Sequence, residues 1–218
     1  MDHDHDGHAH HDHAPPRPDR GDEPSYYRYL ETAVRELLIE KQVITAEDVR
    51  AAVEAMDARI PANGARVVAR AWVDPAFKAR LLADPHAACA ELGLDIGGIR
   101  IDVIEDTADV HNVIVCTLCS CYPRGLLGLP PDWYKARSYR SRVVREPRAV
   151  LAEFGTELAE SVEVRVHDST ADLRYMVLPR RPDATEGMSE AELAALVTRD
   201  SLIGVTMPRS SRGEVQDA

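Results

Sequence analysis

The chain of 218 residues lacks several features that mark whole classes of protein. No run approaches the roughly 20 apolar residues of a membrane span, and the N-terminus lacks the apolar stretch of a secretory signal. Positive charge is also scarce: 26 Lys and Arg against 37 Asp and Glu leave a net charge of −11, which repels nucleic acid and anionic membranes. We therefore expect a cytoplasmic globular protein that binds neither nucleic acid nor membrane.

Cysteine is rare as well, and four residues are too few for a disulfide scaffold in a chain of this size. Cys89 lies in an alanine-rich segment and is expected to be a small buried apolar residue. The other three, Cys116, Cys119 and Cys121, lie within six residues in the string VCTLCSC. This crowding calls for a chemical explanation.

Composition divides the chain into four stretches. Residues 1–24 hold six of the nine histidines, alternating with Asp and followed by prolines, and are expected to be a disordered tail that either captures divalent metal weakly or is merely solvated. Residues 25–96 carry apolar stripes at helical spacing and form a predicted helical arm. Residues 97–208 mix strand and helix patterns and form a predicted metal-binding catalytic domain, followed by a flexible tail at 209–218. The expected fold class is α+β, a helical N-terminal arm plus an α/β core that carries the cysteine cluster.

Apolar periodicity and caps give the expected elements. Helices are predicted at 25–42, 45–60, 62–73, 74–93 and 189–200, with Thr45, Asn63, Asp74 and Ser189 as caps, and helical turns are predicted along 130–155. Strands are predicted at 99–106, 111–115, 161–168, 173–179 and 201–208. The short spacer between 161–168 and 173–179 predicts a hairpin or a sheet crossing.

Three thiolates in the pattern C-x-x-C-x-C indicate a metal site, because free thiols this close would repel as anions or oxidise. Structural zinc prefers four ligands in two separated pairs, and an iron–sulfur cluster as a rule needs four cysteines, so both fit poorly. Because a single residue separates Cys119 from Cys121, the backbone nitrogens of Ser120 and Cys121 can reach a metal held by both sulfurs. A strongly Lewis-acidic, trivalent metal with one open position, which is a catalytic pattern, would suit such a ligand set.

The segment VCTLCSCYPRGLLGLPPDWYKARSYRSRVVREPRAVLAEFG resembles the metal-binding alpha subunit of cobalt-type nitrile hydratase. The segments LRYMVLPRRPDATEG and LVTRDSLIGV resemble its C-terminal part, so that the likeness runs from about Glu36 to about Val205. Thr117, where other members of the family have serine, is similar to the cobalt form.

The resemblance implies a ligand set and a reaction. Cys116, Cys119 and Cys121 would supply sulfur, and Ser120 and Cys121 amide nitrogen, to one non-corrin Co³⁺ per chain. Cys119 would be oxidised to sulfinic acid and Cys121 to sulfenic acid, and both would be catalytic. The implied reaction is hydration of a small nitrile to the amide, with the Cys121 sulfenate oxygen or a water that it activates attacking the nitrile carbon.

The resemblance also implies partners and a pocket. Arginines of a second, different subunit would pair with the oxidised cysteines, so the chain would act only in a heterodimer or heterotetramer, with a cobalt-insertion activator as a further expected partner. Thr117, Arg124 and Trp133 are predicted to line the substrate pocket.

Two departures from the family pattern keep other functions open. Arg124 stands where cobalt nitrile hydratases usually carry a tryptophan, and GLDIGGIRIDVIED lacks the glutamine usual upstream of the cluster. Both features resemble the gamma subunit of the related thiocyanate hydrolase, which converts the thiocyanate anion to carbonyl sulfide and ammonia, and a cation suits an anion. The alternatives are therefore a cobalt thiocyanate hydrolase subunit and a non-catalytic module that stores or delivers metal.

Overall fold

The structure, a computed structural model, describes residues 26–210. Contacts between residues divide the chain into two compact units, 1–50 and 51–218. The first unit contains α1 (Tyr26–Glu40) and the start of α2 (Ala46–Asp57), which confirm the two helices expected first. The predicted N-terminal tail lies outside the described residues, as does most of the predicted C-terminal one.

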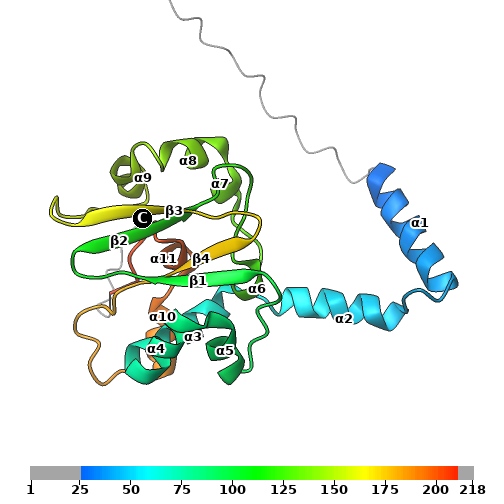
Figure 1. Cartoon of the computed structure of the whole chain (residues 1–218), viewed down its shortest axis with the longest axis horizontal. Coiled ribbons are helices and arrows are strands. Elements are labelled where there is room, and N and C mark those ends of the chain that lie inside the picture. Colours follow the sequence, from blue (N-terminus) through cyan, green and yellow to red (C-terminus); the bar gives the residue numbers. More distant parts are fainter. Residues whose placement is uncertain (1–25, 211–218) are drawn as a thin grey trace, which may run out of the picture. The chain divides into compact units, whose positions relative to one another are not determined.

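The second unit mixes helices with parallel strands, which confirms the predicted α+β class (Figure 1). Its helices are α3 (Pro61–Val73), α4 (Pro75–Ala83), α5 (Pro85–Glu91), α6 (Arg124–Leu127), α7 (Asp132–Lys135), α8 (Arg137–Arg142), α9 (Pro147–Glu153), α10 (Glu190–Leu196) and α11 (Arg199–Ile203). Its strands are β1 (Arg100–Glu105), β2 (Val110–Val115), β3 (Glu163–Asp168) and β4 (Leu173–Leu178). No helix among residues 26–210 is long and apolar enough to cross a membrane.

The four strands form two parallel pairs. β1 pairs with β4, and β2 pairs with β3 in a register that sets Val115 opposite Asp168. β3 and β4 therefore form a sheet crossing and not a hairpin, since each pairs with an earlier strand. Parallel pairing aligns the carboxyl ends of β2 and β3, so Cys116, the residue after β2, comes to lie beside the end of β3.

Helices enclose these strands within the second unit. Figure 1 shows α4 and α5 beside β1 and α9 beside β3, and α3 packs against α10 and α11. The core includes fully buried side chains from both the helices and the strands: Val67, Leu81, Val113, Met176 and Leu202. The sequence placed the domain division at 96/97, whereas the compact unit begins at Ala51, because α3 to α5 bury their apolar faces in the same core as the strands.

Three local expectations differ from the structure. The predicted strand at 201–208 is wrong: Thr198 and Ser201 form a capping box that begins α11, and Gly204, at φ 86°, ends it. Asn63 is not a cap, because α3 begins two residues earlier, at Pro61. The helix expected at 74–93 is divided in two, because Asp84 caps a new helix through the amide of Ala87.

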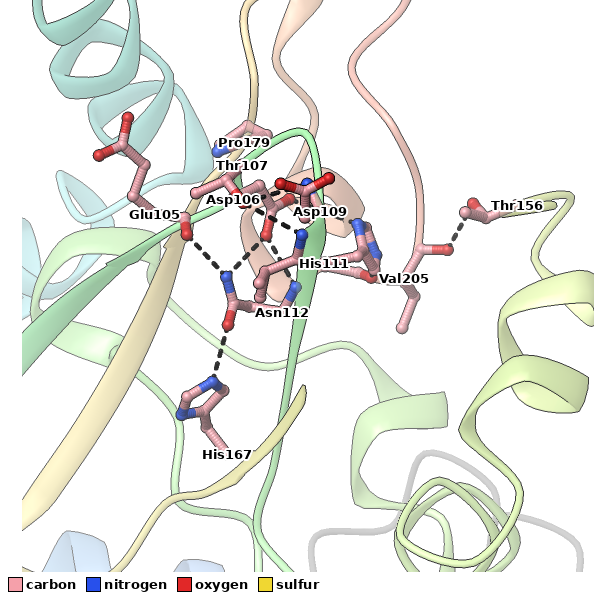
Figure 2. A network of polar contacts seen from close by, with 12 residues as sticks. Glu105, Asp106, Thr107, Asp109, His111, Asn112, Thr156, His167, Pro179 and Val205 are labelled. Carbon is pink, nitrogen blue, oxygen red and sulfur yellow. Dashed lines mark hydrogen bonds and ion pairs between the residues drawn. The ribbon is translucent and has the colours of Figure 1, made fainter. Parts of the chain in front are cut away.

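A buried polar network fixes the beginning of β2 (Figure 2). The carboxylate of Asp106 accepts hydrogen bonds from the backbone and side-chain nitrogens of Asn112 at 2.7 and 2.9 Å. His167 lies 2.9 Å from the side-chain oxygen of Asn112. His111 Nε2 lies 2.7 Å from the carbonyl oxygen of Gly204, while its Nδ1 lies 3.4 Å from Asp106. Burial alone would lower the pKa of His111, but the Asp106 carboxylate and the Gly204 carbonyl outweigh it and hold that pKa above its usual range.

Candidate metal centre

The three clustered cysteines converge at the end of β2. Cys116 is buried, Cys121 is half-buried and Cys119 is exposed. The Sγ atom of Cys119 lies 3.4 Å from that of Cys116 and 3.1 Å from that of Cys121, and all three sulfurs lie within 4.8 Å of one another. Across residues 26–210 they are the one group of His, Cys, Asp or Glu side chains arranged to hold a metal ion.

The spacing of the sulfurs distinguishes between kinds of metal. Sulfurs bonded at about 2.3 Å lie about 3.8 Å apart around a tetrahedral ion and about 3.3 Å apart at the right angles of an octahedral one. The two short separations, 3.1 and 3.4 Å, match the octahedral arrangement. In addition, backbone hydrogen bonds from Ser120 and Cys121 help to lower the pKa of Cys119, so both amides lie near its sulfur. The donor set thus fits an octahedral metal better than structural zinc.

The thiols differ in acidity. Hydrogen bonds from Cys121 and then from Cys116 lower the pKa of Cys119 to about 7. Burial, together with the contact to Cys119, raises the pKa of Cys121 to about 12. Cys89 lies apart in the core, fully buried, and burial raises its pKa to about 11, as expected of a small apolar core residue. Cys119 therefore loses its proton before Cys121 does.

Three side chains hold the loop that carries the cluster. Asp168, at the end of β3, accepts hydrogen bonds from the Thr117 amide at 2.9 Å and the Thr117 hydroxyl at 2.5 Å. Arg140 donates to the Thr117 carbonyl at 3.3 Å. Tyr134 donates from its hydroxyl to the Cys121 carbonyl at 2.8 Å. The loop is thereby fixed at both of its ends.

An aromatic cluster packs around Tyr134 and consists of Tyr122, Trp133, Tyr134, Tyr139 and Phe154. Tyr134 is fully buried and packs edge-on against Tyr122, with ring centroids 5.2 Å apart. Burial raises the pKa of Tyr134 far above its usual range, so its hydroxyl stays protonated and can donate. Trp133 packs against Tyr139 and Phe154, with centroids 4.9 and 4.7 Å away.

A cavity of about 450 Å³ opens over the cluster. Cys119, Ser120 and Cys121 line it, as does Arg124, so the structure brings these predicted site residues together. Trp133 does not: it belongs to the aromatic cluster and lines a different cavity, on the side of α11. Thr117 is likewise absent from the lining, since its side chain is bonded to Asp168.

Sequence reasoning missed Asp168 and two further arginines at the cavity, Arg59 and Arg174. Asp168 ends a predicted strand, and a parallel arrangement of that strand with 111–115 would have placed it beside Cys116. Arg59 and Arg174 come from separate parts of the chain, and no local pattern links them to the cluster.

Comparison with known proteins gives a consistent result. The family model for the nitrile hydratase alpha chain matches residues 25–206. The chain is 55% identical over 176 residues to a nitrile hydratase alpha subunit from a Rhodococcus species, covering 79% of this chain and 88% of that subunit. It is 52% identical over 180 residues to the alpha subunit of the low-molecular weight cobalt-containing nitrile hydratase of Rhodococcus rhodochrous, covering 81% and 86%. Among solved structures, a recombinant thiocyanate hydrolase with partially modified cobalt centres matches with a TM-score of 0.79 at 43% identity, covering 87% of this chain and 93% of that one.

Proposed function

Because the chain belongs to the nitrile hydratase alpha-chain family, we propose that it is the metal-binding catalytic subunit of a cobalt nitrile hydratase, which converts a small nitrile to the amide. The observation that carries this proposal is the cluster of Cys116, Cys119 and Cys121, whose sulfur spacing suits an octahedral ion. In the proposal, the three sulfurs and the amide nitrogens of Ser120 and Cys121 hold one Co³⁺ per chain.

The chemistry is an addition without electron transfer. Water adds across the C≡N bond: its oxygen bonds to carbon, protons pass to nitrogen, and tautomerisation gives the amide. When bound to these donors, Co³⁺ supplies the Lewis acidity that polarises a C≡N group. Cys121 lines the cavity. In the proposal its sulfenate oxygen takes the proton of the water that attacks the nitrile carbon, or attacks that carbon itself, in which case the S–O bond breaks and the water oxygen replaces it on sulfur. Cys119, as the sulfinic acid, adds acceptor oxygens at the exposed side of the cluster.

A second subunit completes the proposed enzyme. Leu118, at the tip of the cluster loop, is 90% exposed, and the neighbouring Cys119 is exposed as well. An apolar side chain next to an open thiol supports a partner surface that covers both and supplies arginines to the oxidised cysteines. We place this heteromeric complex in the cytoplasm, and we expect the chain by itself to be nearly inactive.

One observation favours a second candidate, thiocyanate hydrolysis. Arg124 lines the cavity over the cluster, where its charge would attract an anion. In that reaction thiocyanate and two waters give carbonyl sulfide, ammonia and hydroxide.

A paired assay tests the proposed function and separates these candidates. The complex of the chain with its partner, purified after growth in cobalt, is given acrylonitrile in one vessel and thiocyanate in another. Amide formation supports nitrile hydration. Carbonyl sulfide and ammonia with little amide would reject it in favour of the second candidate.

A further inference from the structure

Three arginines that the ligand set does not use meet at the cavity over the sulfur cluster. Arg59 follows α2, Arg124 begins α6 and Arg174 lies near the start of β4, and all three line the cavity together with Cys119 and Cys121. The lining includes no Asp or Glu among residues 26–210. The chain as a whole has a net charge of −11, so a cavity lined by three arginines and no carboxylate is unusual for this molecule.

The charges of these arginines are not neutralised within the described part of the chain. Neither Arg59 nor Arg124 forms a side-chain hydrogen bond or ion pair there, in contrast to Arg142, which binds both Glu146 and Glu153. Arg174 is half-buried and makes a single long contact of 3.5 Å, to the carbonyl of the preceding residue. Arg59 and Arg174 are half-buried and Arg124 is exposed, so three positive charges without a fixed counter-ion face the cavity, where an anion can pair with them.

Backbone packing fixes where Arg59 stands. Gly128, at φ 73°, lies so close to the backbone of Arg59 that a Cβ at this position would overlap the Arg59 carbonyl oxygen. Gly125 approaches the carbonyl of Ile96 in the same way. The segment after the cluster thus packs directly against two other stretches that line the cavity, around Arg59 and around Ile96. The position of Arg59 at the cavity is therefore built into the fold.

The rest of the lining is mainly apolar and includes Met56, Ile99 and Ile101. An apolar wall with a few convergent cations suits a small organic or pseudohalide anion better than a hydrated metal or a phosphate. A cavity of about 450 Å³ has room for several heavy atoms between the arginines and the sulfurs. Low-polarity walls also strengthen the attraction between the cations and an anion.

We propose that Arg59, Arg124 and Arg174 together select an anionic substrate, one whose C≡N group reaches the cluster while its negative charge rests among the arginines. This rests on the proposed function, because it names the substrate class of the same site. Two sources share this chemistry: a cyano-carboxylate, with the charge at the far end of a short chain, and thiocyanate, with the charge on the triatomic ion itself.

The test compares neutral and anionic substrates that share a C≡N group, on the cobalt-loaded complex. Rates are measured for propionitrile, 3-cyanopropanoate and thiocyanate with the natural chain and with Arg59→Gln, Arg174→Gln and Arg174→Lys. The selectivity is the ratio of kcat/KM for each anion to kcat/KM for propionitrile. Arg180→Gln is the matched control, because Arg180 follows the other end of β4 and does not line the cavity.

We expect the natural complex to prefer an anion over propionitrile by about tenfold or more, with a KM for the anion that rises with salt while that for propionitrile does not. Arg59→Gln and Arg174→Gln should each lower the selectivity about tenfold. Arg174→Lys should restore most of it and Arg180→Gln should leave it within about twofold. Whichever anion is preferred identifies the source.

Other outcomes separate this inference from the proposed function. Preference for propionitrile over both anions, or equal loss with neutral and anionic substrates in Arg174→Gln, would overturn the inference and leave nitrile hydration standing. Turnover of thiocyanate without any amide would reject nitrile hydration and support the anion site. If no substrate reacts, calorimetry of thiocyanate binding decides: a Kd about tenfold weaker in Arg174→Gln supports the inference, and an unchanged Kd overturns it.

Discussion

The carboxylate of Asp168 accepts two hydrogen bonds from Thr117, one from its backbone amide at 2.9 Å and one from its hydroxyl at 2.5 Å. This contact joins the end of β3 to the residue that directly follows Cys116, and so sets the first turn of the cluster loop. Thr117, the residue in which the sequence resembles the cobalt form of the family, is therefore held by a neighbouring strand.

Removal of this contact should weaken the metal site. Asp168→Ala deletes both acceptors, each a charge-assisted hydrogen bond worth about 1.5 kcal/mol at the low end, so we expect cobalt per chain and activity to fall several-fold. Metal analysis of the purified complex measures the amount of cobalt per chain. Asp172→Ala, in the exposed turn after β3, is the control and should retain its cobalt. Full cobalt in Asp168→Ala would contradict this role.

Tyr134 should contribute to stability through one hydroxyl. Tyr134→Phe removes a fully buried donor and leaves the Cys121 carbonyl without it, which should lower the free energy of unfolding by about 1–3 kcal/mol. Urea unfolding of the complex measures the change. Tyr175→Phe removes the hydroxyl of a half-buried ring and should shift stability by less than about 0.5 kcal/mol. Equal effects of the two substitutions would argue against a specific hydrogen bond at Cys121.

Alanine substitutions at Gly93 and Gly128 should show how much destabilisation comes from backbone strain and how much from steric overlap. Gly93 and Gly128 both have φ near +70°, at 71° and 73°, but a Cβ meets nothing within 4 Å at Gly93 and overlaps the Arg59 carbonyl at Gly128. Gly93→Ala should therefore cost about 1 kcal/mol, and Gly128→Ala clearly more. Thermal unfolding of both variants checks the order. If the Gly128→Ala protein were as stable as the Gly93→Ala protein, the backbone at Arg59 would be free to shift away, and its position would not be fixed by Gly128.

The stability should depend on pH through His111. Because the pKa of His111 is raised in the folded chain, its stabilising effect is fully present below the ordinary pKa of 6.5 and is lost as the pH rises through the raised value. The difference in unfolding free energy between the natural chain and His111→Gln should thus shrink as the pH rises from 6 toward about 9.

His167 provides a control of opposite sign. Burial and then the charge of Arg165 lower its pKa, so the neutral ring is favoured in the folded chain. Its effect is a cost that grows as the pH falls below 6.5, and His167→Gln should gain stability relative to the natural chain at acid pH. Parallel pH trends for the two variants would show that a general acid effect and not these two rings is responsible.

Much of the fold followed from local patterns. The structure confirms the predicted capping boxes at Thr45 and Ser189 and the predicted cap at Asp74. Each of these side chains accepts a hydrogen bond from a backbone amide in the first turn of the helix that it begins. The predicted last strand is wrong, because the apolar run after Ser201 favours a strand but the capping box of Thr198 with Ser201 begins a helix there. Local hydrogen bonds at a helix start outweighed β propensity there.

In the candidate metal centre, too, residues close together in the sequence could be predicted and residues brought in by strand pairing could not. Cys116, Cys119 and Cys121 are close in sequence, so their spacing alone predicted a common ligand set, and their proximity is as expected. Asp168 and Arg174 reach the cluster only through the parallel pairing of β2 with β3 and of β1 with β4. A pattern within one strand carries no information on its partner strand, so these residues became visible only in the structure.

The cobalt content of the purified complex tests the central claim most directly. The account predicts about one cobalt per chain in the natural protein and almost none in Cys121→Ala, with Cys89→Ala, in the core, keeping its cobalt. Zinc in place of cobalt, or full cobalt in Cys121→Ala, would contradict the assignment of the three-cysteine cluster as the cobalt centre.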